Sequence, residues 1–219
     1  MLSFAEEIFL LSLDDVDGSV SLSGGLPMLH LSLVGAALCE LSFLGRIDTD
    51  QEFLYLVSTE KVNDPVLDMV IDIIKARDAA ETINFWIVNL LGEAKNIRKH
   101  IQRQLVAQGI LKEVEERIFW VFPSRRYPVI DNEEIEDVER RLKDIILNPQ
   151  AIPAPRDAVL IGLAYACGIF QEIFSPKEYR RLQDRISKLA KLDSIVRETA
   201  IMINERSIMN VDSLRATPI

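Results

Sequence analysis

The sequence predicts a mainly α-helical protein: a single-domain helical bundle with surrounding amphipathic helices and one protruding β-hairpin at about residues 110–122. Apolar residues recur at helical spacing along most of the chain, whereas two β-prone runs around a polar turn occur beside Glu115 and Glu116. The 219 residues suit one domain, and 48% hydrophobic residues suffice for a core without a disulfide or metal. We assign residues 1–204 to this domain. Residues 205–219 lack an apolar stripe, so we expect a flexible C-terminal tail.

Capping and breaking signals place the individual elements. Ser3 and Glu6 have the spacing of a capping box, Pro65 is typical of a first helical turn, and Gly109 is typical of a helix end. In chain order, we expect helices at 4–13 and 27–44, a strand-like run at 47–57, helices from 65, at 79–89 and at 94–108, the hairpin, and helices at 132–147, at 157–174 and from 175 to about 204.

Composition restricts the class of protein. The net charge is −9, so nucleic acid and anionic membranes repel the chain unless basic residues gather locally. Cys39 and Cys167 stand alone in apolar stretches, which indicates buried thiols in a reducing compartment. The longest uncharged apolar run, residues 159–170, is shorter than the roughly 20 residues of a bilayer span. We therefore expect a soluble, cytoplasmic protein.

Catalytic and metal-binding patterns are missing from the sequence. His30 and His100 are the only histidines, and no His/Cys cluster has ligand spacing. His30 lies in an apolar run, where we expect a hydrogen-bonded imidazole in or at the edge of the core. The acidic stretches 14–17 and 133–139 are interpreted as a solvated turn and a helix N-terminus. We expect no enzyme activity, no metal and no cofactor.

One helix carries an unusual concentration of positive charge. The segment 95–103 contains four cations and no acid, although the chain as a whole is acidic. At about 100° per residue, all four fall on one face, opposite Ile97, Ile101 and Leu105. The four cations are Lys95, Arg98, Lys99 and Arg103. This basic face is the candidate site for negatively charged lipid headgroups.

The predicted hairpin adds aromatic residues beside further cations. Arg117, Arg125 and Arg126 flank or follow the run that contains Phe119 and Trp120. In a strand, neighbouring side chains point to opposite faces, so a single packed face hides only part of this aromatic set. An exposed aromatic ring beside Arg or Lys suits the interface of an anionic membrane, where each cation contributes about 1 kcal/mol. We expect these five residues to contact the membrane.

Three other interpretations stay open. The charges can form a solvated helix face, with the aromatic residues in the core. The acidic surface or the hairpin can bind partner proteins or a second copy of the chain without any role for lipid. A helix followed by an aromatic hairpin is also typical of a winged-helix DNA binder, but the acidic net charge disfavours nucleic acid as a partner.

Short motifs in a definite order run from about residue 3 to 203. They are EEIFLLSLDDVDG at 6–18, LCELSFLGRI at 38–47, AKNIR at 94–98 with LVAQGIL at 105–111, RYP at 126–128, and AVLIGLAYAC at 158–167 with FSP at 174–176. In this order they resemble the Golgi phosphoprotein 3 family of peripheral membrane adaptors. The sequence resembles a minimal, prokaryotic-type member, because the family's long disordered N-terminal region has no counterpart here.

The resemblance implies a fold and a function. It implies a helical, non-enzymatic protein with a protruding hairpin that binds phosphatidylinositol 4-phosphate and recruits cytosolic tails of membrane proteins, on the cytosolic face of the Golgi in a eukaryotic cell. Lys95 and Arg98 stand at two basic positions of the family's headgroup pocket. The sequence departs from the family at two other pocket positions, where Ser23 and Val34 replace a Trp and an Arg. We therefore expect contact with anionic lipid in general, without strict specificity for one headgroup.

Overall fold

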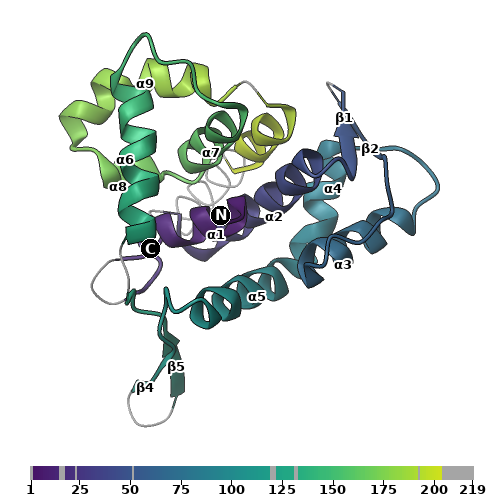
Figure 1. Ribbon diagram of the computed structural model, residues 1–219, viewed down its shortest axis with the longest axis horizontal. Helices are drawn as coiled ribbons and strands as arrows, with labels where there is room; N and C mark the ends of the chain where they lie inside the picture. Colours follow the sequence, from purple (N-terminus) through teal and green to yellow (C-terminus); the bar gives the residue numbers. More distant parts are fainter. Residues whose placement is uncertain are drawn as a thin grey trace, which may run out of the picture.

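The computed structural model describes residues 2–14, 18–22, 24–50, 52–118, 122–130, 133–191 and 193–203. In this part of the chain the fold is mainly α with a β-hairpin, as predicted (Figure 1). The helices are α1 (Phe4–Leu11), α2 (Gly25–Phe43), α3 (Pro65–Lys75), α4 (Ile83–Leu90), the 3₁₀ turn η1 (Leu91–Glu93), α5 (Ala94–Ala107), α6 (Glu133–Leu147), α7 (Pro155–Ala166), α8 (Ile169–Ile173) and α9 (Pro176–Leu189), followed by helical residues 194–203. The predicted tail, residues 205–219, lies outside the described residues, and the division into one domain and a tail stays a prediction.

Two strand groups accompany the helices. One is an antiparallel sheet of β1 (Ile47–Thr49), β2 (Phe53–Leu56) and β3 (Glu81–Thr82), in that order. The other is the hairpin of β4 (Val114–Ile118) and β5 (Phe122–Arg126), which projects beyond the end of α5 in Figure 1. The strand-like run expected at 47–57 forms two antiparallel strands, β1 and β2, rather than one, and β3, which was expected to be helical, completes their sheet.

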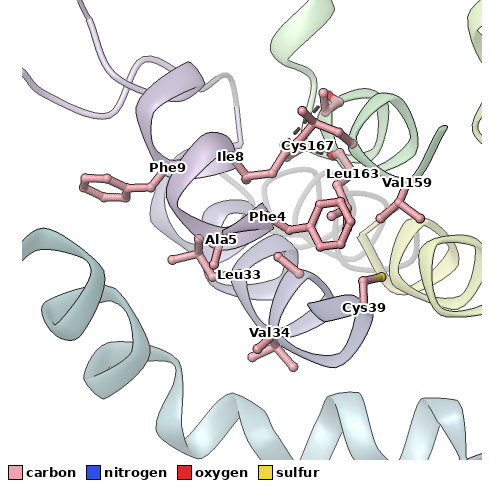
Figure 2. Close-up of a cluster of buried hydrophobic side chains, with 14 of the residues drawn as sticks. Phe4, Ala5, Ile8, Phe9, Leu33, Val34, Cys39, Val159, Leu163 and Cys167 are labelled. Atoms are coloured by element: carbon pink, nitrogen blue, oxygen red, sulfur yellow. Dashed lines mark hydrogen bonds between the residues drawn. The ribbon is translucent and has the colours of Figure 1, made fainter. Parts of the chain in front are cut away.

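Helices α1 and α2 form the centre of the molecule. Figure 1 shows α6 to α9 on one side of them and α3 to α5 on the other, in agreement with the contacts of α2 with α5 and of α1 with α7. Figure 2 shows where the apolar faces meet: Phe4 and Ile8 of α1 lie among Leu33 of α2 and Val159 and Leu163 of α7. The prediction that no uncharged apolar run approaches the length of a bilayer span is wrong for α2: this helix has the length and composition of a membrane span, but 67% of that window is buried inside the fold. The apolar composition of α2 is therefore explained by its place as the core helix.

The predicted caps are confirmed in detail. The Ser3 hydroxyl accepts a hydrogen bond from the Glu6 backbone N–H at 3.2 Å, and the Glu6 carboxylate accepts one from the Ser3 N–H at 2.8 Å. Asp64 caps α3 through the N–H groups of residues 66 and 67, and Ser175 caps α9. Both predicted cysteine thiols are free and buried, and burial raises the pKa of Cys167 to about 11.

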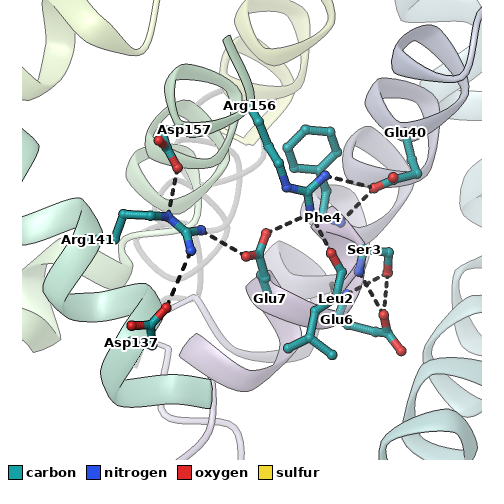
Figure 3. A network of polar contacts seen from close by, with 10 residues as sticks. All are labelled: Leu2, Ser3, Phe4, Glu6, Glu7, Glu40, Asp137, Arg141, Arg156 and Asp157. Carbon is teal, nitrogen blue, oxygen red and sulfur yellow. Dashed lines mark hydrogen bonds and ion pairs between the residues drawn. The ribbon is translucent and has the colours of Figure 1, made fainter. Parts of the chain in front are cut away.

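A nearly buried carboxylate joins the N-terminal helix to the second half of the chain (Figure 3). The Glu7 side chain is only 4% exposed, and its two oxygens lie 2.9 Å from Arg141 of α6 and 2.9 Å from Arg156 of α7. Arg141 also bonds Asp157 at 2.8 Å, and Arg156 lies 3.7 Å from Glu40 of α2. The ion pairs therefore connect α1, α2, α6 and α7 around one desolvated charge.

Two predicted boundaries are wrong. The helix expected over 157–174 breaks at Gly168, whose φ of +83° lies in the left-handed region that favours glycine, so α7 and α8 are separate. The hairpin spans 114–126 rather than 110–122. Glu115 and Glu116, expected in its turn, lie in β4 and pair in register with Arg125 and Ser124.

Candidate functional site

Helix α5 divides into a buried and an exposed face, as its sequence pattern predicts. Ala94, Ile97, Ile101 and Leu105 are at most 3% exposed. Lys95, Lys99 and Arg103 are exposed on the other side. The 3₁₀ turn η1 leads directly into α5, and the buried residues pack the helix against α2. The sequence pattern thus fixes which side of α5 carries the cations.

Arg98 lies at the edge of this face rather than at its centre. Its side chain is half-buried, and its Nε is buried without a hydrogen-bond partner among the described residues. Burial lowers the pKa of Arg98, an effect that the nearby Tyr127 hydroxyl partly offsets. An arginine stays protonated under all ordinary conditions, so Arg98 is a partly desolvated positive charge with a free donor.

His30 of α2 faces the same place from the neighbouring helix. Burial lowers the pKa of His30, and the positive charges of Arg98 and then Lys95 lower it further, which places all three groups within electrostatic reach. The Nε2 of His30 is buried and has no hydrogen-bond partner in the described part of the chain. The expected position at the edge of the core is confirmed, but the expected hydrogen bond is not formed at Nε2 within the described residues.

Among the described residues, no carboxylate of the protein itself neutralises the cations of the basic face. Lys95, Arg98, Lys99 and Arg103 form no ion pair there, whereas Arg46, Lys61, Arg77 and Arg141 each pair with a carboxylate. Glu93, the acid closest in sequence, accepts a hydrogen bond from Asn96 instead. Within the described ranges, the positive charge on α5 therefore has no carboxylate partner.

Two exposed apolar side chains belong to segments near α5, the start of α2 and the base of the hairpin. Leu26 is 41% exposed and precedes His30 by one helical turn on α2, so both lie on the same side of that helix. Ile130 is 62% exposed and follows Tyr127 at the base of the hairpin. An apolar side chain beside cations is the combination that interfacial membrane contacts use.

The rest of the predicted site is only partly placed. Arg117 lies in β4, and Arg125 and Arg126 lie in β5, but only the backbone of these strands is described. Phe119 and Trp120 lie outside the described residues, between the ends of β4 and β5. Their contact with a membrane stays a prediction.

The comparison with known families agrees with this architecture. A family model described as Golgi phosphoprotein 3 (GPP34) matches residues 4–204, nearly the whole chain. The chain belongs to the Golgi phosphoprotein 3 family. It is thus a Golgi phosphoprotein 3-like protein, from a family of non-enzymatic adaptors.

In this Golgi phosphoprotein 3 fold, the structure brings together residues that the sequence analysis did not connect. Lys95 and Arg98 lie within electrostatic reach of His30 of α2, and Arg98 also within reach of Tyr127, whereas Lys99 and Arg103 lie further around the exposed side of α5. Val34, at the predicted position of a family pocket arginine, is fully buried in the core. The residue of α2 that faces the cations is His30, one turn earlier.

Proposed function

We propose that this protein is a peripheral membrane adaptor that binds an anionic lipid headgroup between Lys95 and Arg98 of α5, beside His30 of α2. The observation that carries this proposal is a set of cations that form no ion pair with any described residue, in a chain of net charge −9. A half-buried guanidinium with an unused donor is an unfavourable arrangement unless an acceptor from outside completes it. Phosphate oxygens are strong acceptors for arginine, and Lys95 adds a point charge.

The surroundings of the pair suit a membrane better than a free anion. Lys99 and Arg103 extend the positive surface along the exposed side of α5. Leu26 and Ile130 supply apolar side chains at its edges. Repulsion from the acidic remainder is screened beyond about 8 Å at physiological ionic strength, whereas the cations that touch the surface are not. A planar anionic surface satisfies all of these groups together.

Membership of the Golgi phosphoprotein 3 family supports phosphatidylinositol 4-phosphate as the lipid and the cytosolic face of a membrane as the proposed location. It equally supports the binding of cytosolic tails of membrane proteins as cargo. The projecting hairpin is the surface on which we propose contact with the membrane or self-association. These partners follow from the family and from the shape of the molecule.

Vesicle cosedimentation tests the proposal. We expect the chain to sediment with phosphatidylcholine vesicles that contain phosphatidylglycerol or phosphatidylinositol 4-phosphate, and to stay in solution with phosphatidylcholine alone. The double variant Lys95→Glu/Arg98→Glu loses two cations worth about 1 kcal/mol each, so its affinity for anionic vesicles falls at least about 30-fold. Lys95 is exposed and Arg98 is half-buried, so circular dichroism of the double variant checks that the fold is retained.

A matched control separates a local site from general electrostatics. Lys177 and Arg181 are exposed cations on α9, distant from α5 in Figure 1, and reversing both changes the net charge by the same amount. We expect the Lys177→Glu/Arg181→Glu variant to bind within about twofold of the wild type, since no cation near the membrane is lost. Equal losses in the two double variants would show that only net charge matters. Equal sedimentation with neutral and anionic vesicles would contradict the proposal as well.

A further inference from the structure

The chain contains two histidines, and only one of them faces the candidate headgroup site. His30 lies beside Arg98 and Lys95 across the contact between α2 and α5. His100 is directed to the opposite side of α5, where its Nε2 lies 3.5 Å from the Asp64 carboxylate. A titration near neutral pH at the headgroup site therefore belongs to His30, because an unperturbed histidine titrates near 6.5 and the acids and lysines do not.

The two charged groups that shift the pKa of His30 are both positive. They are Lys95 and Arg98 on α5, and the first turn of α2 itself contains no acid. Tyr127 acts on Arg98. Without an anion, these neighbours hold His30 in its neutral form at neutral pH. A phosphate between the same cations reverses the local balance and favours the charged imidazolium.

We propose that His30 takes up a proton when an anionic lipid headgroup binds at Lys95 and Arg98, so that docking on an anionic membrane strengthens as the pH falls. This inference rests on the proposed function of the site. The buried Nε2 without a partner is the atom that gains an acceptor, and protonation makes both ring nitrogens donors. The direction follows from linkage: a state that binds one more proton is favoured at lower pH. The affinity thus rises from neutral pH through the ordinary range of histidine and levels off below the pKa of the unliganded protein.

Vesicle binding at two pH values measures this linkage. The probe is phosphatidylcholine vesicles with phosphatidylglycerol, because a phosphodiester keeps its single negative charge between about pH 7.5 and about pH 5.5. One additional cation at the surface corresponds to about fivefold tighter binding at the lower pH. His30→Gln keeps a polar side chain that cannot ionise, so its affinity does not change between the two pH values. His30→Arg carries a permanent charge, so its affinity is also independent of pH and exceeds that of His30→Gln.

His100→Gln is the control for the other histidine, and we expect it to keep the full pH response. The proposal is overturned if His30→Gln retains the increase in affinity on acidification, or if His30→Arg binds no better than the wild type at about pH 7.5. Equal binding of the wild type at the two pH values overturns this inference alone and leaves the proposed function standing. Absence of binding to anionic vesicles at both pH values overturns the proposed function together with it.

Discussion

Replacing Glu7 with alanine is expected to lower the free energy of unfolding by about 3 kcal/mol, one of the two largest effects of a single substitution expected here. Glu7 is 4% exposed and accepts hydrogen bonds from Arg141 and Arg156 at 2.9 Å each. Removing the Glu7 carboxylate takes one partner away from each of these two partly buried guanidinium groups. The cost lies at the lower end of the range for buried pairs, because Asp157 still bonds Arg141 and Glu40 still faces Arg156.

Urea unfolding followed by circular dichroism measures this loss, and at this chain length it corresponds to a decrease in Tm of roughly 6 to 12 °C. The matched control is Asp72→Ala, which removes an exposed carboxylate 2.6 Å from Lys61. Exposed pairs contribute 1 kcal/mol or less, so we expect this variant to stay within about 1 kcal/mol of the wild type. A Glu7→Ala variant as stable as the control would show that the ion pairs around Glu7 contribute little to the fold.

Replacing Arg185 with alanine is expected to cost about 2 to 3 kcal/mol. Its guanidinium, on α9, caps the C-terminus of α6, where backbone carbonyls lack intrahelical partners and carry partial negative charge. Nε bonds the Ile146 carbonyl at 3.0 Å, and Nη1 bonds that of Pro149 at 3.1 Å. Nη2 bonds the carbonyls of Ile145, Asn148 and Ala151 at 2.9, 2.6 and 3.0 Å. One side chain thus attaches α9 to the end of α6 and to the segment that follows.

The control for Arg185 lies one turn earlier on the same helix. Arg181 is exposed and forms none of these bonds, so Arg181→Ala changes the free energy of unfolding by less than about 0.5 kcal/mol. Arg185→Lys keeps the charge but not the planar fork, and we expect it to recover less than half of the loss. Full recovery by lysine would mean that the charge alone, rather than the bonds to five carbonyls, stabilises the end of α6.

Local signals predicted much of this fold. The capping box of Ser3 and Glu6, the proline in the first turn of α3 and the glycine end at Gly109 are short-range features, which depend only on neighbouring residues. The buried and exposed sides of α5 also followed from its periodicity. The sequence did not predict the pairings between strands that lie far apart in the chain. Strand β3 exists because it pairs with β2, some 27 residues earlier in sequence (Leu54 with Glu81), and no local pattern shows this.

The site could be predicted only on one of its two helices. Lys95 and Arg98 stand out because their segment contains no acid, but His30 becomes part of the site only through the packing of α2 against α5. From the sequence, Val34 is the α2 residue that stands at the position of a family pocket arginine. In the structure its side chain is buried in the core. The hairpin was found, but its register was not, because β4 and β5 pair around residues that carry no glycine signal for a turn.

The central claim is that Arg98 binds the phosphate of a headgroup. It is tested most directly by following the Arg98 Nε–H signal in nuclear magnetic resonance spectra while the chain is titrated with inositol 1,4-bisphosphate, a soluble headgroup analogue. The account predicts a saturable shift of this signal together with the ring signals of His30, because both groups lack a partner in the described structure. An Arg98 signal that stays in place at saturating ligand, or shifts confined to the arginines of α9, would contradict it.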